Sequence, residues 1–180
     1  ATLSTHLGNG CPAKIDRHPN PIWEQLAQDQ LWISVIGDGF HLPEQVIKVF
    51  SKVKKEKMIW VSDSTAFAGM KPGQYESHIG GEVILSSTGR LCMAEDESLL
   101  AGAAVSMLQI IENSWRNRWF SLEESWQMGS VRPLHYLEKS TLDRDQVELQ
   151  IDHKNKTLKI LKVWKSGSIL WSREEGYNEL

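Results

Sequence analysis

The sequence contains few cysteines and no long apolar run. Its two cysteines, Cys11 and Cys92, are too few for a disulfide framework, and no CxxC pair is present. No apolar stretch approaches the roughly 20 residues that a membrane helix needs. A secretory leader begins with a charged segment followed by an apolar one, and the first residues of this sequence do not have that pattern. We therefore expect a cytoplasmic protein that has no membrane partner.

The sequence also lacks an excess of positive charge. Lys and Arg number 20 against 23 Asp and Glu, which gives a formal net charge of −3. This balance excludes a strongly basic nucleic-acid binder and leaves no polybasic patch for a membrane surface. With 180 residues, of which 41% are hydrophobic and 24% charged, the chain has the composition of one globular domain or two small ones.

Three short β-prone runs each stop at a loop that contains polar residues. They are residues 1–5, 31–36 and 58–61. The second and third are apolar almost throughout rather than alternating, which predicts parallel strands buried on both faces of a sheet. Helical patterns follow the first two runs, at 21–27 and 43–52. This β-loop-α order predicts an α/β fold.

The rest of the chain predicts helices and antiparallel strands instead. The expected elements, in order, are a surface hairpin over 82–93, an amphipathic helix over about 101–115, a second helix over 122–128 and strands near 147–151, 158–163 and 169–171. Ser121 and Glu124 have the spacing of a capping box at the start of the second helix.

Each of the three predicted parallel strands is followed by residues that can bind a metal or move a proton. His6 follows the first, Asp38 and His41 follow the second, and Asp63 follows the third. Because the carboxyl ends of parallel strands meet at one edge of a sheet, we expect these side chains to converge. A single histidine there is more often structural, and an aspartate often caps the next helix. The coincidence of three strand ends favours an active site.

Five motifs occur in a fixed order around these positions. They are Thr5-His6-Leu7-Gly8-Asn9-Gly10, Asp16-Arg17, Asp38-Gly39-Phe40-His41, Val61-Ser62-Asp63-Ser64-Thr65 and Leu100-Ala101-Gly102. In order and spacing they resemble the carboxyl-terminal half of the N-acetylglucosamine-6-phosphate deacetylases, over residues 1–130 well and over the tail loosely. These proteins are metal-dependent amidohydrolases with a (β/α)8 barrel and a small β-sandwich domain.

The resemblance implies that the chain is the carboxyl-terminal part of such a barrel. About three β/α units, barrel strands 6 to 8 with their helices, would occupy residues 1–78. A hairpin and the closing helices would occupy 79–140, and antiparallel strands of a small β-sandwich portion would occupy 141–180. Because a barrel needs eight strands, the missing amino-terminal half is an expected partner. The chain alone is then expected to be inactive.

Carried over by position, the resemblance implies roles for six residues. His6 corresponds to a metal ligand, and Asp63 corresponds to the aspartate that acts as general base and then as general acid. Four residues are implied in substrate binding. Asn9 and the backbone of Gly10 hold the sugar phosphate, and Arg17 contacts the phosphate, in some relatives from the neighbouring subunit of a dimer. His41 contacts the substrate. The other metal ligands, a Glu and a second His, are expected upstream of residue 1.

The implied cofactor is a divalent metal, with zinc favoured and iron or another transition metal as alternatives. A catalytic zinc leaves a coordination position for water, lowers the pKa of that water toward ~7 and polarises an amide carbonyl. The implied partners are a phosphorylated amino sugar, the other half of the barrel and a second copy in a homodimer.

Two departures from the family's motifs leave the substrate open. Gly10-Cys11 stands where many relatives have Ala-Met, and Ala103-Ala104 stands where they often carry small hydroxyl residues. Another N-acyl or cyclic amide is therefore an alternative substrate for the same metal chemistry. A non-catalytic sugar-binding relative and a complete three-layer α/β domain are alternatives of other classes.

Overall fold

The structure of the chain is a computed structural model that describes residues 1–77, 80–138, 145–174 and 176–177. The chain divides into two compact units, Ala1–Arg132 and Pro133–Leu180. The predicted domain boundaries at 78–79 and 140–141 lie outside the described residues. None of the described helices is both long enough and apolar enough to cross a membrane.

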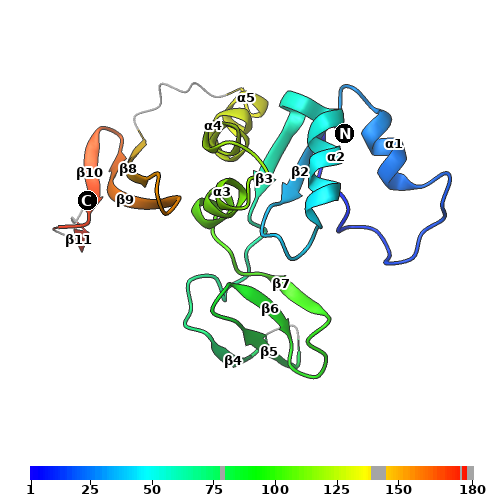
Figure 1. Cartoon of the computed structure of the whole chain (residues 1–180), viewed down its shortest axis with the longest axis horizontal. Helices are drawn as coiled ribbons and strands as arrows, with labels where there is room; N and C mark the ends of the chain where they lie inside the picture. The colour runs from blue at the N-terminus through cyan, green and yellow to red at the C-terminus, as the bar shows by residue number, and fades with distance from the viewer. Residues whose placement is uncertain (78–79, 139–144, 175, 178–180) are drawn as a thin grey trace. The chain divides into compact units, whose positions relative to one another are not determined.

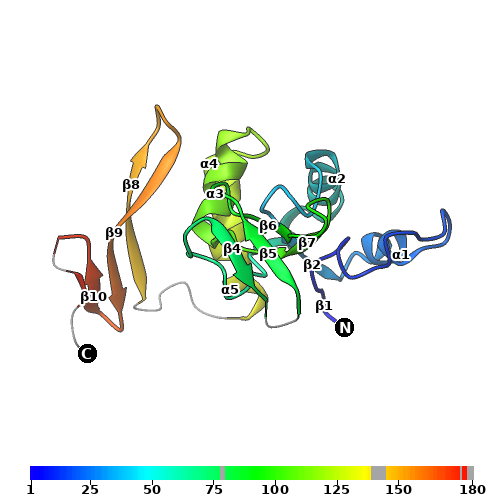
Figure 2. The same cartoon turned by 90° about the horizontal axis from the view of Figure 1, so that it is seen from below.

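The first unit is centred on a parallel sheet with the strand order β1-β2-β3 (β2 and β3 are labelled in Figure 1, β1 in Figure 2). Its strands are β1 at Leu3–Ser4, β2 at Trp32–Ile36 and β3 at Met58–Val61. Ser4 pairs with Ile33, and Ser34 pairs with Ile59, both in parallel register. The three strands therefore end at the same edge. The predicted parallel sheet is confirmed, although β1 is shorter than the run at 1–5.

Two helices pack on one face of this sheet. They are α1 at Pro21–Ala27 and α2 at Glu44–Lys54, the second followed by a 3-10 turn, η1, at Lys55–Lys57. The side chain of Asn20 accepts hydrogen bonds from the backbone N–H groups of Ile22 and Trp23 and so caps α1. The apolar side chains of both helices join the sheet in one core cluster, which includes Leu26, Ile33, Val35, Ile47, Phe50, Met58 and Trp60.

A four-stranded antiparallel sheet follows β3. Its strands, in the order β4-β5-β6-β7, are Gly73–Glu76, Glu82–Leu85, Arg90–Met93 and Leu100–Ala103. The predicted hairpin is confirmed as the central pair, β5 and β6. The sheet has a small apolar core of its own, in which Val83 and Leu91 are fully buried. The outer strands β4 and β7 were not predicted.

The chain then returns to the first core as a helical segment. Its parts are α3 at Met107–Arg116, α4 at Leu122–Trp126 and a π turn, η2, at Gln127–Val131. Helix α5, at Arg132–Tyr136, follows in sequence and leads from the first unit into the second. The expected start of the first helix near residue 101 is wrong, because β7 occupies that stretch and Ser106 caps α3. The predicted capping box of Ser121 and Glu124 is confirmed at α4.

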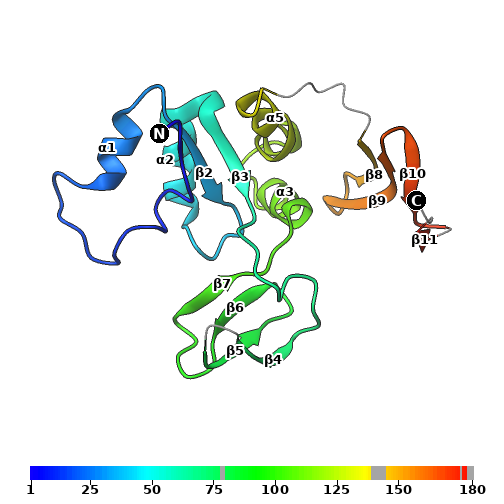
Figure 3. The same ribbon diagram turned by 180° about the vertical axis from the view of Figure 1, so that it is seen from behind.

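The second unit contains a four-stranded antiparallel sheet with the order β11-β10-β9-β8 (β8 to β10 are labelled in Figure 2, β11 in Figure 3). Its strands are β8 at Gln146–Asp152, β9 at Thr157–Lys165, β10 at Ser168–Ser172 and β11 at Gly176–Tyr177. The three predicted tail strands are therefore confirmed. Asn155 and Gly167 lie in the two turns, where Asp152 accepts a hydrogen bond from the backbone of Asn155 and Gly167 has a φ of +84°.

Candidate active site

His6 follows β1 in a left-handed backbone conformation that contacts with β2 support. Its φ is +33°, in the left-handed region that L-residues avoid. The hydroxyl of Ser34, in the middle of β2, accepts a hydrogen bond from the His6 backbone N–H at 2.8 Å. The backbone carbonyl of Ser34 accepts another from the N–H of Leu7 at 2.9 Å. β2 thus fixes the turn that carries the imidazole.

The loop after His6 folds back over the imidazole. The His6 carbonyl accepts a hydrogen bond from the backbone N–H of Asn9 at 2.9 Å. A Cβ at Gly10 would lie 3.0 Å from His6 Cε1, so glycine lets the loop approach the ring closely. Residues 4–8 and 10–12, together with Pro21, Ile22 and Gln25 of α1, line a cavity of about 400 Å³. The predicted site residues His6 and Gly10 therefore share one cavity wall.

Two polar atoms in this loop are buried without a partner. His6 Nδ1 and Asn9 Nδ2 make no hydrogen bond to any described residue. Buried polar groups usually find a partner, so each such atom calls for an explanation. A ring nitrogen of this kind suits coordination of a metal ion. The described residues contain no cluster of three or more metal-ligating side chains.

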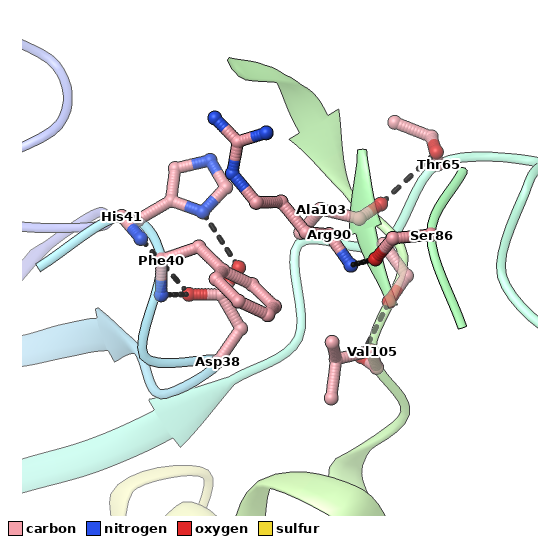
Figure 4. A network of polar contacts seen from close by, with 9 residues as sticks. Asp38, Phe40, His41, Thr65, Ser86, Arg90, Ala103 and Val105 are labelled. Carbon is pink, nitrogen blue, oxygen red and sulfur yellow. Dashed lines mark hydrogen bonds and ion pairs between the residues drawn. The ribbon is translucent and has the colours of Figure 1, made fainter. Parts of the chain in front are cut away.

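Asp38 and His41 form a pair in the loop after β2 (Figure 4). Asp38 Oδ2 lies 2.7 Å from His41 Nδ1. Asp38 Oδ1 accepts hydrogen bonds from the backbone N–H groups of Phe40, at 2.8 Å, and of His41, at 3.0 Å. The Asp38 side chain is 1% exposed, whereas the His41 side chain is 13% exposed. His41 is therefore the member of the pair that other molecules can reach.

The charge of Asp38 follows from these contacts. Burial raises the pKa of its carboxyl group, but the hydrogen bonds from the His41 side chain and from the backbone of His41 and Phe40 outweigh burial. The pKa consequently lies below its ordinary value of 3.8. Asp38 is ionised at neutral pH and can therefore only accept hydrogen bonds.

Asp63 lies two residues beyond the end of β3 and is exposed. Its φ is +47°, again in the left-handed region. The next residues are anchored where β7 leads into α3. The Ser64 hydroxyl donates to the Val105 carbonyl at 2.8 Å. The Ala103 carbonyl accepts hydrogen bonds from the Thr65 backbone N–H, at 2.8 Å, and from the Thr65 hydroxyl, at 3.0 Å, of which Figure 4 draws the second. The second sheet thereby holds the turn that presents Asp63.

The strand register brings these groups to one edge of the parallel sheet. β2 lies between β1 and β3, and all three strands run in the same direction. Parallel neighbours are about 4.8 Å apart, so the ends of β1 and β3 are roughly 10 Å apart. His6 and Asp63 thus follow the two outer strands, on either side of the strand that leads to Asp38 and His41.

Arg17 is placed differently. It is exposed on the loop between β1 and α1, which extends outward beyond α1 and away from the sheet (Figures 1 and 3). Its backbone carbonyl accepts hydrogen bonds from Asn20 Nδ2 at 3.1 Å and from Trp23 Nε1 at 3.3 Å. The structure thus ties the Arg17 backbone to the start of α1 and does not bring Arg17 to the strand ends.

Sequence reasoning missed the contribution of Ser34. This residue is 2% exposed, and its hydroxyl is the contact that holds His6. The available signal was a lone hydroxyl within an otherwise apolar strand, since a polar group buried there needs a specific partner. The identity of that partner depends on the pairing of β1 with β2, which is not a property of either segment alone.

Known proteins with similar sequence or structure agree on one group of relatives, although no family model matches the chain. The N-acetylglucosamine-6-phosphate deacetylase of Haemophilus influenzae is 30% identical over 134 residues, which are 74% of this chain and 34% of that protein. The N-acetylgalactosamine-6-phosphate deacetylase of a Shewanella species is 22% identical over 179 residues, or 95% of this chain and 43% of that protein.

A solved structure of N-acetyl-D-glucosamine-6-phosphate deacetylase from Mycobacterium smegmatis, in complex with N-acetyl-D-glucosamine-6-phosphate, is similar with a TM-score of 0.73. The match covers 94% of this chain and 45% of that chain, at 21% identity. This likeness establishes the fold of the chain as that of part of such a protein. The chain spans between a third and a half of the length of these three relatives.

Proposed function

We propose that this chain, a homologue of the N-acetylglucosamine- and N-acetylgalactosamine-6-phosphate deacetylases, forms the carboxyl-terminal part of a metal-dependent hydrolase. The reaction is removal of acetate from an N-acetylated hexosamine 6-phosphate. The observation that carries the proposal is the shared edge of the parallel sheet. There His6, the pair of Asp38 and His41, and Asp63 follow three strands in the order of the family's motifs.

In this proposal the parallel sheet is a segment of a (β/α)8 barrel. β1, β2 and β3 are its strands 6 to 8, and the other strands pair with the outer edges of β1 and β3. Among the described residues no strand pairs with those two edges. We call the chain together with the other half of its barrel, on one polypeptide or two, the assembled enzyme. Its cofactor is a divalent metal, most simply zinc, and its compartment is the cytoplasm.

Three residues of the chain have separate roles in the proposed reaction. His6 supplies one metal ligand, and the bound metal would polarise the acetamide carbonyl and acidify a water molecule. Asp63, exposed at the strand edge, takes a proton from the attacking water and returns it to the nitrogen as acetate leaves. The buried Nδ2 of Asn9, which has no partner among the described residues, can donate a hydrogen bond to the sugar phosphate.

Arg17 fits this scheme through a dimer. It lies on a loop that extends away from the strand ends of its own chain, and its side chain is exposed. A guanidinium on such a loop can reach the active site of a second copy, where it would bind the phosphate with two parallel hydrogen bonds. The homodimer and the phosphate contact therefore belong to one proposal.

The test is release of acetate from N-acetylglucosamine 6-phosphate and N-acetylgalactosamine 6-phosphate by the assembled enzyme. The Asp63→Asn variant should bind substrate normally and lose roughly 10²-fold or more in turnover, since it lacks the acid-base group. Asp96→Asn, which changes an exposed aspartate in the loop between β6 and β7, is the matched control and should keep full activity. Undiminished turnover in Asp63→Asn would remove Asp63 from the mechanism. Absence of acetate release from both sugars would reject the proposed function.

A further inference from the structure

The loop that carries Asp38 is held rigidly by the core beneath it. A Cβ at Gly37 would lie 2.5 Å from Ile110 Cγ2 and 2.8 Å from Trp60 Cε3, closer than any side chain can approach. Gly39 has a φ of +83°, and a Cβ there would lie 2.9 Å from Trp119 Cη2. The backbone on both sides of Asp38 is therefore pressed against packed apolar groups. This packing limits how far the backbone that carries the carboxylate can move.

The two carboxylate oxygens of Asp38 have separate tasks. Oδ1 accepts both backbone hydrogen bonds, from Phe40 and His41, and so closes the turn. Oδ2 is left for the imidazole of His41, at 2.7 Å from Nδ1. One oxygen thus shapes the loop, and the other determines how the ring is turned and which nitrogen is protonated.

We infer that Asp38 is a positioning residue that acts through His41, holding the imidazole as the Nδ1–H tautomer with Nε2 presented to the substrate. Because the ring nitrogens lie on opposite sides, the contact at Nδ1 directs Nε2 away from Asp38. In neutral His41 this Nε2 is a hydrogen-bond acceptor, and the ligand group that it suits is a hydroxyl of the sugar. The role in catalysis depends on the proposed deacetylase function, whereas the tautomer does not.

The Asp38→Asn variant separates the two tasks. The amide oxygen of Asn can keep both backbone hydrogen bonds, so the turn should persist. The amide NH2 then faces Nδ1 of His41, which reverses the tautomer and makes Nε2 a donor. The Asp38→Ala variant loses both tasks and shows the effect of an opened turn. Thermal melting of both variants distinguishes a local change from general unfolding.

The first readout is the protonation of His41, followed by ¹⁵N NMR of the assembled enzyme with labelled histidine. The His41→Ala variant assigns the signal. Spectra are recorded at about pH 9, above the ordinary titration range of histidine. We expect the Nδ1–H tautomer in the wild type and the Nε2–H tautomer in Asp38→Asn. An Nε2–H tautomer in the wild type would overturn the inference, whatever the enzyme does with sugar phosphates.

The second readout is a double-mutant cycle on kcat/KM for the acetylated sugar phosphate. We expect kcat/KM to fall by about 10–100-fold in Asp38→Asn, by analogy with the loss found when the partner that orients a metal-binding histidine is removed. In the His41→Ala background the same substitution should change kcat/KM by less than about twofold, since Asp38 then has nothing to orient. An equal loss in both backgrounds would make Asp38 merely structural. If the assembled enzyme releases no acetate, the proposed function fails, and the NMR result alone decides the tautomer.

Discussion

Replacing Ser34 with alanine tests whether the serine hydroxyl holds His6 in place. The hydroxyl accepts the His6 backbone N–H at 2.8 Å, and it donates to the Ser4 carbonyl at 3.4 Å, a length at which little energy is gained. In Ser34→Ala the N–H of His6 loses its acceptor. An unsatisfied donor costs about 1–3 kcal/mol when buried, and His6 is half-buried, so we expect a loss of about 1–2 kcal/mol.

Stability and metal affinity together measure this effect. The free energy of unfolding is taken from urea titration of the assembled enzyme. Ser168→Ala, at an exposed position in β10, is the matched control and should stay within about 0.5 kcal/mol of the wild type. Because the turn at His6 is loosened, metal affinity should also fall, by about 10-fold or more. If Ser34→Ala were as stable as the control and bound metal as tightly, the hydroxyl would not position His6.

Four further outcomes are expected. Gly37→Ala should lower the free energy of unfolding by about 1–3 kcal/mol in urea titration, because its Cβ overlaps Ile110 and Trp60. The folded-state pKa of Asp38 is lowered, so its ionisation stabilises the fold above pH 3.8, and the urea midpoints of wild type and Asp38→Asn should converge as the pH falls below that value. Arg17→Ala should mainly raise KM for a phosphorylated sugar and leave the unphosphorylated one unchanged in steady-state assays; equal losses would make Arg17 structural. The 180-residue chain by itself should release no acetate and should self-associate in light scattering through the open edges of β1 and β3, so a monodisperse monomer would count against the barrel.

The elements that the sequence predicted well are those specified by neighbouring residues. The capping box of Ser121 and Glu124 involves groups only three positions apart. The apolar runs of β2 and β3 are recognisable because both faces of the parallel sheet are covered by protein. These sequence signals do not depend on contacts with distant parts of the chain.

The errors fall where a distant partner determines the local structure. Leu100, Ala101 and Ala103 have high helix propensity, and their segment nevertheless forms β7. It does so because it pairs with β6 and because the Ala103 carbonyl accepts a hydrogen bond from the Thr65 backbone. β4 at Gly73–Glu76 is half polar, and only its pairing with β5 makes it a strand. Propensity is a weak preference, and nonlocal hydrogen bonds override it.

Part of the candidate site can also be recognised from the sequence, whereas the rest depends on tertiary contacts. The order of His6, Asp38, His41 and Asp63 behind three strand-like runs is a property of the amino-acid sequence, and the family resemblance could be seen from it. Only the tertiary structure shows that the Ser34 hydroxyl accepts a hydrogen bond from the His6 backbone and that β2 lies between β1 and β3. It also decided that Arg17 lies on an outlying loop. The physical reason is the sequence separation of the interacting groups. Helix caps and the periodic spacing of apolar residues involve residues within a turn or two of the chain. A site is instead assembled by strand register and by hydrogen bonds between residues some thirty positions apart.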